Sequence, residues 1–555
     1  MATHDVFNQP PPLHDYDPLA QDRALLEALH REGAGWAKDE VGALGRRAAS
    51  REALAWGTQA NENPPRLKTH DRYGNRVDEI EFHPAWHELM RLSIAHGIHA
   101  GPWREPREGA HVARAAKMLL VSQTDFGHGC PISMTYSAFP ALQRQPELLE
   151  EWAPHLLSLS YDPRSAPVRE KQGALIGMGM TEKQGGSDVR ANATRAVPTG
   201  DGAFALTGHK WFFSAPMSDA FLVLAQAPRG LSCFLLPRFT PDGQRNRFFL
   251  QRLKDKLGNR SNASGEVEFD GAFARLVGEE GRGVQTILEM VNHTRLDCVI
   301  GSAGMMRAAL AQAAHHCAHR SAFGKRLLDQ PLMRSVLADL ALESEAATVL
   351  MMRLARAYDG KGRAGLSGVQ PGHRAAGNPS DEEAPFRRLA TAVAKFWVCK
   401  RAAPHVAEAL ECLGGNGYVE ESGMPRIYRE APLNSIWEGS GNVICLDVLR
   451  ALHKEPQARE ALLAELRLSR GADRRLDTAL DAVEADLTKP DEAHARRLVE
   501  RLAVTLQGAL LVRHAPHAVA DAFCATRIAG DHGYLFGTLP AGVDVDAILA
   551  RAWPA

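Results

Sequence analysis

The residues best suited to chemistry begin in a polar loop near the middle of the chain. An apolar run from Ala174 to Met180 leads into Thr181, and Gly185-Gly186, Ser187 and Asp188 follow within eight positions. Glycines let backbone N–H groups approach a ligand closely, and hydroxyls can bond phosphate or the polar atoms of a ring. The same composition is also typical of a surface turn after a short strand, so this segment alone leaves both interpretations open.

A second candidate is a carboxylate flanked by small residues. Glu438 stands between Trp437 and Gly439, where little bulk would keep it from a pocket. A carboxylate with a solution pKa of ~4.3 is a poor base for a carbon acid, so burial would have to raise its pKa before it could act as one. The alternative is that Glu438 orders the start of a helix, because Glu-Gly-Ser-Gly-Asn also suits an N-terminal turn.

Hydrophobic spacing predicts helices, then strands, then helices again. Residues 18–159 repeat apolar side chains at helical spacing, whereas residues 173–269 contain short apolar runs separated by Gly, Pro, Asp and Asn, which is typical of an antiparallel β unit. Helical spacing returns over 284–354 and 390–413, and again from 443 to the end with breaks near Gly471 and Pro490. Residues 359–385 are rich in Gly, Ser, Pro and charge, which predicts a flexible surface loop.

Composition excludes several classes of protein. The chain has 555 residues, a formal net charge of −1 and eight cysteines without a CxxC pair, so it gives no whole-chain sign of a nucleic-acid partner, a disulfide framework or a zinc site. No signal peptide and no run of ~20 apolar residues is present, and a cytoplasmic location is expected. His315 and His319 are one helical turn apart but lack a third ligand, so no metal is predicted.

Four further motifs follow the polar loop in a fixed order. They are Lys210-Trp-Phe-Phe-Ser214, Arg320-Ser-Ala-Phe-Gly324 with Gln330, Gly414-Gly-Asn-Gly-Tyr418 and Ile436-Trp-Glu-Gly-Ser-Gly-Asn442. With them the sequence resembles the acyl-CoA dehydrogenase superfamily and, more narrowly, its AidB branch of bacterial alkylation-response flavoproteins. The resemblance implies a mainly α fold with a central antiparallel β domain. Its expected parts are an N-terminal helical domain (1–170), a middle β-barrel (171–286), a C-terminal four-helix bundle (287–452) and an added helical domain (453–555).

The resemblance also implies FAD as cofactor and assigns roles to individual residues. Glu438 would be the general base that removes the α-proton of an acyl thioester while a hydride leaves the β-carbon for the flavin. Arg320 and Gln330 would reach the FAD of a neighbouring subunit in a homotetramer, a dimer of dimers. The expected cofactor-binding residues are Met178, Gly179, Met180, Thr181, Gly185, Gly186, Ser187, Phe212, Phe213, Ser214, Arg320, Gln330, Ile436, Trp437, Gly439, Ser440, Gly441 and Asn442.

Two positions depart from an ordinary member of the family. Many acyl-CoA dehydrogenases place Asp-x-x-Arg against the acyl-CoA, whereas this chain keeps Arg295 and has Asn292 in place of the carboxylate. The residues around Trp211 also differ from the usual strand. Both departures argue against efficient turnover of a CoA thioester, and neither argues against flavin binding.

The tail from Lys454 to Ala555 is the element that the resemblance adds to the usual fold, and the AidB branch is associated with binding double-stranded DNA through it. It contains 13 Lys and Arg against 15 Asp and Glu, so DNA binding requires its basic residues to gather on one face. Such contacts to phosphates would be non-specific and salt-sensitive. The expected DNA-binding residues are Arg450, Arg467, Arg470, Arg474, Arg475, Arg496 and Arg497.

Three functions therefore compete. The first is an FAD flavoprotein of the alkylation-damage response and of DNA repair that binds double-stranded DNA without sequence specificity and has weak or no dehydrogenase turnover. The second is a working short- or branched-chain acyl-CoA dehydrogenase whose tail serves oligomerisation. The third is a flavin-stabilised DNA shield in which Glu438 has no catalytic task.

Overall fold

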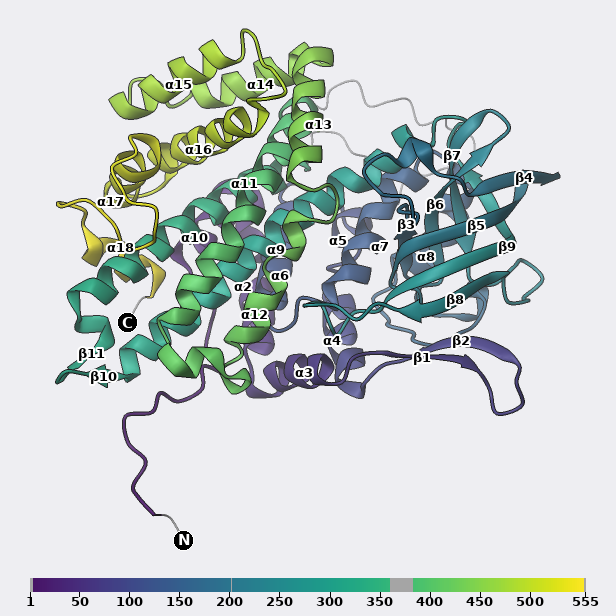
Figure 1. Cartoon of the computed structure of the whole chain (residues 1–555), viewed down its shortest axis with the longest axis horizontal. Helices are drawn as coiled ribbons and strands as arrows, with labels where there is room; N and C mark the ends of the chain where they lie inside the picture. Colours follow the sequence, from purple (N-terminus) through teal and green to yellow (C-terminus); the bar gives the residue numbers. More distant parts are fainter. Residues whose placement is uncertain (1–2, 201, 360–382, 554–555) are drawn as a thin grey trace.

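A computed structural model describes residues 3–200, 202–359 and 383–553. A β-barrel stands beside a large helical body, and the C-terminal helices cover the end of that body farthest from the barrel (Figure 1). None of the described helices combines the length and apolar character that a membrane span requires.

The N-terminal part is helical except for one hairpin. Its helices are α1 (Arg23–Leu29), α2 (Lys38–Ala48), α3 (Arg51–Glu62), α4 (Pro84–Ala95), α5 (Gly101–Arg104), α6 (Ala110–Ser122), α7 (Gly129–Leu142) and α8 (Pro146–Leu156). The expectation of uninterrupted helix over 18–159 is wrong at β1 (Arg66–His70) and β2 (Arg76–Glu81), which pair antiparallel. Leu67 and Ile80 of this hairpin pack against the barrel core, and that tertiary contact outweighs local helical preference.

The middle part forms a closed barrel. Its strands are β3 (Ile176–Gly179), β4 (Arg195–Gly200), β5 (Ala203–Ser214), β6 (Ala220–Ala227), β7 (Gly230–Pro237), β8 (Phe248–Leu253) and β9 (Ser264–Val277). Pairing runs β5–β4–β6–β7–β9 and closes from β9 back to β5. The expected antiparallel arrangement needs correction, because β3 lies parallel to β6 and β4 also meets β6 in parallel, so the sheet is mixed.

Alternation within β6 explains how the barrel attaches to the helices. Phe221 and Val223 point into the barrel interior, whereas Leu222 and Leu224 pack on the opposite side with residues of α7 and α8. A strand that is apolar on both faces is buried on both faces. This strand therefore sets the position of β3, which pairs with it from Ile176 to Gly179.

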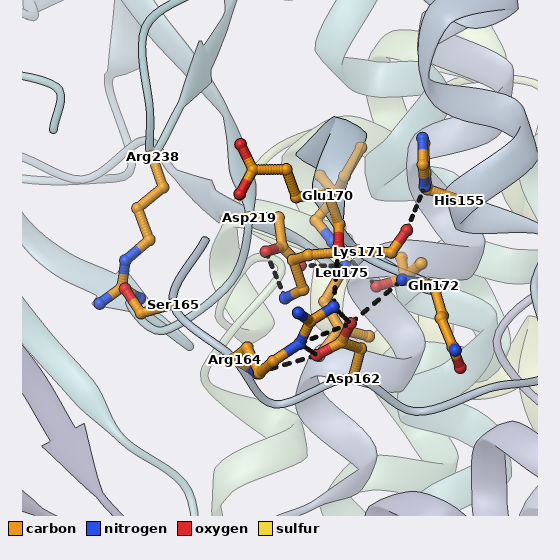
Figure 2. A network of polar contacts seen from close by, with 12 residues as sticks. His155, Asp162, Arg164, Ser165, Glu170, Lys171, Gln172, Leu175, Asp219 and Arg238 are labelled. Carbon is orange, nitrogen blue, oxygen red and sulfur yellow. Dashed lines mark hydrogen bonds and ion pairs between the residues drawn. The ribbon is translucent and has the colours of Figure 1, made fainter. Parts of the chain in front are cut away.

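A polar network fixes the segment that enters the barrel (Figure 2). Asp219 accepts hydrogen bonds from Lys171 Nζ at 2.6 Å and from the main-chain N–H of Leu175 at 2.9 Å. His155, near the end of α8, contacts the main-chain oxygen of Lys171 at 3.0 Å. These contacts join α8 to the start of β3 and so hold the polar loop that follows β3 in place.

The bundle is built from three long helices and two shorter ones, all of them largely buried. They are α9 (Gly283–His319), α10 (Pro331–Ala357), α11 (Ala384–Glu411), α12 (Met424–Glu430) and α13 (Gly441–Lys454), with a small hairpin of β10 (Ser321–Ala322) and β11 (Lys325–Arg326) between α9 and α10. The hairpin interrupts the helix expected over 284–354. The flexible loop expected over 359–385 lies mostly outside the described residues, and its last two residues begin α11.

The tail folds onto the bundle. It contains α14 (Pro456–Arg467), α15 (Arg474–Asp486), α16 (Ala495–His514), α17 (His517–Phe523) and α18 (Val545–Ala552), with the expected breaks at Gly471 and Pro490. Leu462 and Leu502 belong to the same buried cluster as Leu340 and Val393 of the bundle. The tail and the bundle thus share one core. All eight cysteines of the chain are buried and free.

We expect the ion pair of Lys210 and Glu182 to be critical for the barrel. Both side chains are fully buried, their charged atoms are 2.7 Å apart, and Glu182 also accepts from the main-chain N–H of Ala193 at 2.7 Å. Lys210→Ala would leave a buried carboxylate without its partner and lower the free energy of unfolding by about 3–5 kcal/mol in urea denaturation. Arg247→Ala, which breaks the exposed pair with Asp270, would cost below about 1 kcal/mol. Equal losses in the two variants would contradict this assignment.

Candidate functional site

The Glu438 loop is held by main-chain contacts from two bundle helices. Arg295 Nε of α9 donates to the main-chain oxygen of Glu438 at 3.1 Å, and Lys395 Nζ of α11 donates to that of Gly439. Glu438 has a φ of 58°, in the left-handed region that non-glycine residues rarely adopt. A conformation of this kind costs free energy and persists where surrounding contacts impose it, which is common at functional sites.

The Glu438 carboxyl group faces a cavity and lacks a full set of partners. Its Oε2 is buried and accepts no hydrogen bond from the described residues. Burial raises the pKa of the Glu438 carboxyl, while the hydroxyl of Thr294 and the charges of Arg295 and Lys395 oppose that rise. A carboxylate of raised pKa at a cavity wall has the properties of a general base.

Arg295 has a partner that the sequence did not reveal. Its Nη1 lies 2.7 Å from Asp447 Oδ2 of α13, and Arg388 Nη2 lies 2.9 Å from the other oxygen of Asp447. Asn292, the residue that replaces the expected carboxylate, receives the Tyr358 hydroxyl on its main-chain oxygen. The charge of Arg295 is therefore compensated inside the bundle, and the missing Asp at position 292 does not leave it unpaired.

The cavity lies between the N-terminal helices, the barrel edge and α9. Its wall near Glu438 includes Trp437, Met178 of β3 and Ser214 of β5, and the last two are direct partners in the sheet. A mainly apolar part is formed by Ile98, Met118, Val121, Ile132, Met134 and Met305. Such a cavity can hold an elongated apolar group with one end beside Glu438.

The expected flavin-contacting residues divide into those at the cavity and those beside it. Met178, Ser214, Trp437 and Glu438 line the cavity. Thr181 and Asn442 do not belong to its wall, as far as the structure describes it. From Met178 the chain continues through Gly179, Met180 and Thr181 into an exposed loop that contains Gly185, Gly186 and Ser187. A Cβ at Gly186 would lie 2.4 Å from Thr181 Oγ1, so a side chain at position 186 would displace that hydroxyl.

Phe213 does not have the expected position. It is fully buried in the barrel core, with its ring centroid 4.4 Å from that of Phe221, whereas Phe212 is 49% exposed. Successive side chains of a strand point to opposite faces, so only one of the two rings can face a cofactor outside the barrel. The ring of Phe212 lies on the outer side, whereas the ring of Phe213 is enclosed in the barrel core and does not reach a ligand outside the barrel.

The segment after Glu438 turns toward the tail. Ile436 is exposed, and Gly439 and Ser440 lead into α13, which begins at Gly441. Asn442 Oδ1 accepts from Arg496 Nη1 of α16 at 3.2 Å. Asn442 therefore lies at the contact between the bundle and the tail.

Arg320 and Gln330 lie at the β10–β11 hairpin, away from the cavity. Arg320 Nη1 donates to the main-chain oxygen of Asn8 at 2.6 Å, and Gln330 Nε2 donates to that of Ala322 at 3.0 Å. Neither lines the cavity that contains Glu438. Within one chain they cannot share a ligand with Glu438 unless that ligand extends well beyond the cavity.

The residues at the barrel edge fit the expected FAD. Ser214 and Met178 present polar and main-chain groups at the cavity, the exposed loop has open space at Gly185 and brings Thr181 Oγ1 close to Gly186, and Phe212 offers an exposed ring. Ser440 stands at the N-cap of α13, and its side chain makes no capping hydrogen bond to the start of that helix.

Four polar residues of the cavity have no counterpart in the sequence-based expectation. Ser93, His128, Asn259 and Glu430 also line it, and they come from four separate parts of the chain. Only a concentration of small and polar residues around His128 (Phe126-Gly-His-Gly-Cys130) marks one of them in the sequence. We call these four residues the polar patch.

The tail arginines do not form one free basic surface. Arg467, Arg470 and Arg475 are paired with Glu484, Asp481 and Asp473 at 2.9, 2.8 and 2.6 Å. Arg474 and Arg497 form no ion pair with the described residues, and Arg450 is 3.9 Å from Asp447.

The unpaired charges also lie apart. Arg475 contacts Asp521 of α17, whereas Asp486, at the other end of α15, contacts Arg501 of α16. Arg474 is thus separated from Arg496 and Arg497 by the length of α15, roughly 18 Å at 1.5 Å per residue.

Known proteins are similar to this chain over most of its length. Three family models match: Adaptive response protein AidB N-terminal domain over residues 8–163, acyl-CoA dehydrogenase middle domain over 177–272 and acyl-CoA dehydrogenase C-terminal domain over 281–453. The Escherichia coli (strain K12) protein named "Putative acyl-CoA dehydrogenase AidB" is 49% identical over 524 residues, 94% of each chain.

Two further similarities involve Caenorhabditis elegans. Its acyl-CoA dehydrogenase family member 11 is 32% identical over 537 residues, covering 90% of this chain and 83% of the relative. The crystal structure of C. elegans ACDH-11 in complex with C11-CoA is similar with a TM-score of 0.83 at 29% identity, covering all of this chain and 98% of the other.

We expect Glu438→Gln to change how stability depends on pH. Because the folded state raises the pKa of Glu438 above its ordinary 4.5, the folded protein holds the proton more strongly than the unfolded chain. Wild-type stability contributed by this group is therefore present below pH 4.5 and is lost as pH rises above it. The free energy of unfolding of the variant should gain on that of the wild type between pH 4 and pH 7. A difference between variant and wild type that stays constant over this range would refute a raised pKa.

Proposed function

Because the chain belongs to the AidB-like branch of the acyl-CoA dehydrogenase superfamily and is an FAD-dependent acyl-CoA dehydrogenase-like oxidoreductase, we propose that Glu438 takes the α-proton of an acyl thioester. The observation that carries this proposal is the Glu438 carboxyl group, which faces the cavity with one oxygen unpartnered and a raised pKa. The similar ACDH-11 structure contains C11-CoA, which supports an acyl-CoA ligand for this cavity as well.

In the proposed reaction the residues of this chain position and exchange one proton. Arg295 and Lys395 fix the main chain on both sides of the Glu438 side chain, and burial strengthens the carboxylate as a base. The apolar part of the cavity would hold the acyl chain and exclude water. Bound FAD supplies the acceptor for the hydride that leaves the β-carbon.

We assign the cofactor-holding role to the barrel edge and the segments beside it. Met178 to Thr181, Gly185 to Ser187, Phe212 and Ser214 would hold the ring and the pyrophosphate, with the segment from Ile436 to Asn442 opposite. Arg320 and Gln330 would contact the FAD of a second copy, because one chain keeps them away from the cavity.

An exposed apolar group beside Arg320 supports assembly. Phe323 is 99% exposed, and Leu332, Tyr418 and Val419 are also exposed. Exposed apolar side chains of this size, when gathered, are typical of surfaces that contact another protein. They offer a contact for a second copy, and we propose a homotetramer in which one subunit completes the cofactor site of another.

We expect the purified protein to show a flavin absorption spectrum that acyl-CoA substrates bleach. Bleaching should disappear in Glu438→Gln, because the amide cannot accept the α-proton, while the flavin remains bound. Glu421→Gln, an exposed acidic residue, should retain bleaching. A flavin-free folded protein would contradict the cofactor proposal. Unimpaired bleaching in Glu438→Gln would contradict its role as the base.

A second candidate function is non-specific binding of double-stranded DNA in the response to alkylation damage. It is favoured by the name of the family model matching residues 8–163 and by a group of cations at the junction of α11, α13 and α16. A Cβ on Gly441 would lie 2.9 Å from Lys400 Nζ, and the charge of Arg496 helps to lower the pKa of Lys400, although burial is the larger cause. Arg497 and Arg450 are exposed nearby on α16 and α13.

We expect point variants to test DNA binding better than removal of the tail, which would expose the shared core. The triple substitution Arg450→Ala, Arg496→Ala, Arg497→Ala should lower DNA affinity and reduce the slope of log K against log salt by about 3. The matched triple substitution of Arg467, Arg470 and Arg475, which are neutralised by carboxylates, should change the slope little. If both triple variants retain DNA equally at low salt, the surface formed by Arg450, Arg496 and Arg497 does not bind DNA.

A further inference from the structure

Glu438 aside, the polar patch differs from the rest of the cavity wall in carrying buried acceptors, on Asn259 and Glu430, that have no partner among the described residues. Ser93, His128, Asn259 and Glu430 are each at least nine-tenths buried, with exposed fractions of 1, 2, 3 and 1%. An apolar acyl chain would leave these two acceptors unsatisfied, and an unsatisfied buried polar group is costly. They therefore call for a ligand that carries a hydrogen-bond donor at this place.

One half of the polar patch is a buried hydrogen-bonded chain. Asp125 Oδ2 lies 3.1 Å from His128 Nδ1, and His128 Nε2 lies 2.9 Å from Ser93 Oγ. Asp125 also receives the hydroxyl of Ser261 and the amide of Asn61 at 2.6 Å. With Nδ1–H directed to the carboxylate, Nε2 accepts the Ser93 proton, so the remaining lone pairs of Ser93 Oγ are free to accept from a ligand.

The other half contains acceptors that no group of the described residues satisfies. Glu430 Oε1 accepts from the main-chain N–H of Asn259 at 2.7 Å, whereas Glu430 Oε2 has no partner. The side-chain oxygen of Asn259 also has none. Burial, together with the nearby charge of Asp125, raises the pKa of Glu430 to about 7.

Both halves meet through a short loop. Ser261, which contacts Asp125, is two residues from Asn259, which contacts Glu430. The two halves are thus linked through the main chain of residues 259–261, and all four residues of the polar patch line the cavity that Glu438 also lines.

We propose that the polar patch binds a hydroxyl group carried by the acyl chain, so that the preferred ligand is a hydroxyacyl thioester and not a plain aliphatic one. The inference rests on the proposed function, because it assumes that the cavity receives an acyl thioester. A ligand O–H would donate to one of the free acceptors of the polar patch, and its oxygen could accept from Glu430 when that carboxyl is protonated. Discrimination follows because the plain chain would leave the same buried acceptors desolvated and unpaired.

The test compares two thioesters of equal chain length by isothermal titration calorimetry on the flavin-loaded protein. One is a straight-chain acyl-CoA, and the other carries a hydroxyl beyond the β-carbon. Wild type should bind the hydroxylated thioester about tenfold more tightly or better. Ser93→Ala should reduce that preference, measured as the ratio of the two dissociation constants, at least about threefold. Ser344→Ala, which removes a buried helical hydroxyl outside the cavity, should keep the preference.

The outcomes separate this inference from the function on which it rests. Equal affinity for both thioesters in the wild type, as expected if only water satisfies the polar patch, would overturn the hydroxyl site and leave the proposed function intact. Absence of binding by either thioester would overturn the proposed function itself. If Ser93→Ala fails to fold, the affinities of the wild type for the two thioesters still decide whether the hydroxyl site exists.

Discussion

Arg295 donates to the main-chain oxygen of Glu438 while its other end pairs with Asp447, and this double contact determines where the Glu438 carboxyl group can lie. The guanidinium is buried between α9 and α13, and Arg388 neutralises the second oxygen of the same aspartate. A buried charge is tolerated only when it is paired and hydrogen-bonded. The bundle must therefore bring three helices together correctly before Glu438 can adopt its left-handed backbone conformation beside the cavity.

Much of the architecture could be predicted from the sequence because it depends on local periodicity. The apolar runs at Phe221 and Ser232 became strands β6 and β7, and the breaks at Gly471 and Pro490 ended helices as expected. Features set by distant contacts were missed. The β1–β2 hairpin forms because Leu67 and Ile80 find the barrel, and β3 runs parallel to β6 because the Lys171–Asp219 pair fixes its entry.

In the site, too, some residues could be predicted from sequence motifs, whereas others depend on tertiary packing. Motif order placed Met178, Ser214, Trp437 and Glu438 together, and the cavity contains all four. The choice between Phe212 and Phe213 required the phase of strand β5, which the run of adjacent rings hides. The polar patch could not be foreseen, since its members come from α4, the start of α7, the loop after β8 and the end of α12. Nor could composition show that most of the tail arginines are already neutralised by carboxylates.

The burial of every cysteine has a consequence for a cell under chemical attack. The thiolate, not the thiol, is the reactive nucleophile, and burial raises the pKa of Cys130, at the cavity wall, and of Cys233, in the barrel, to about 12 each. At neutral pH such sulfurs stay protonated and shielded. Electrophiles that modify exposed cysteines elsewhere in the proteome would find no comparable target on this chain, so its fold can persist while more reactive proteins accumulate thioether adducts.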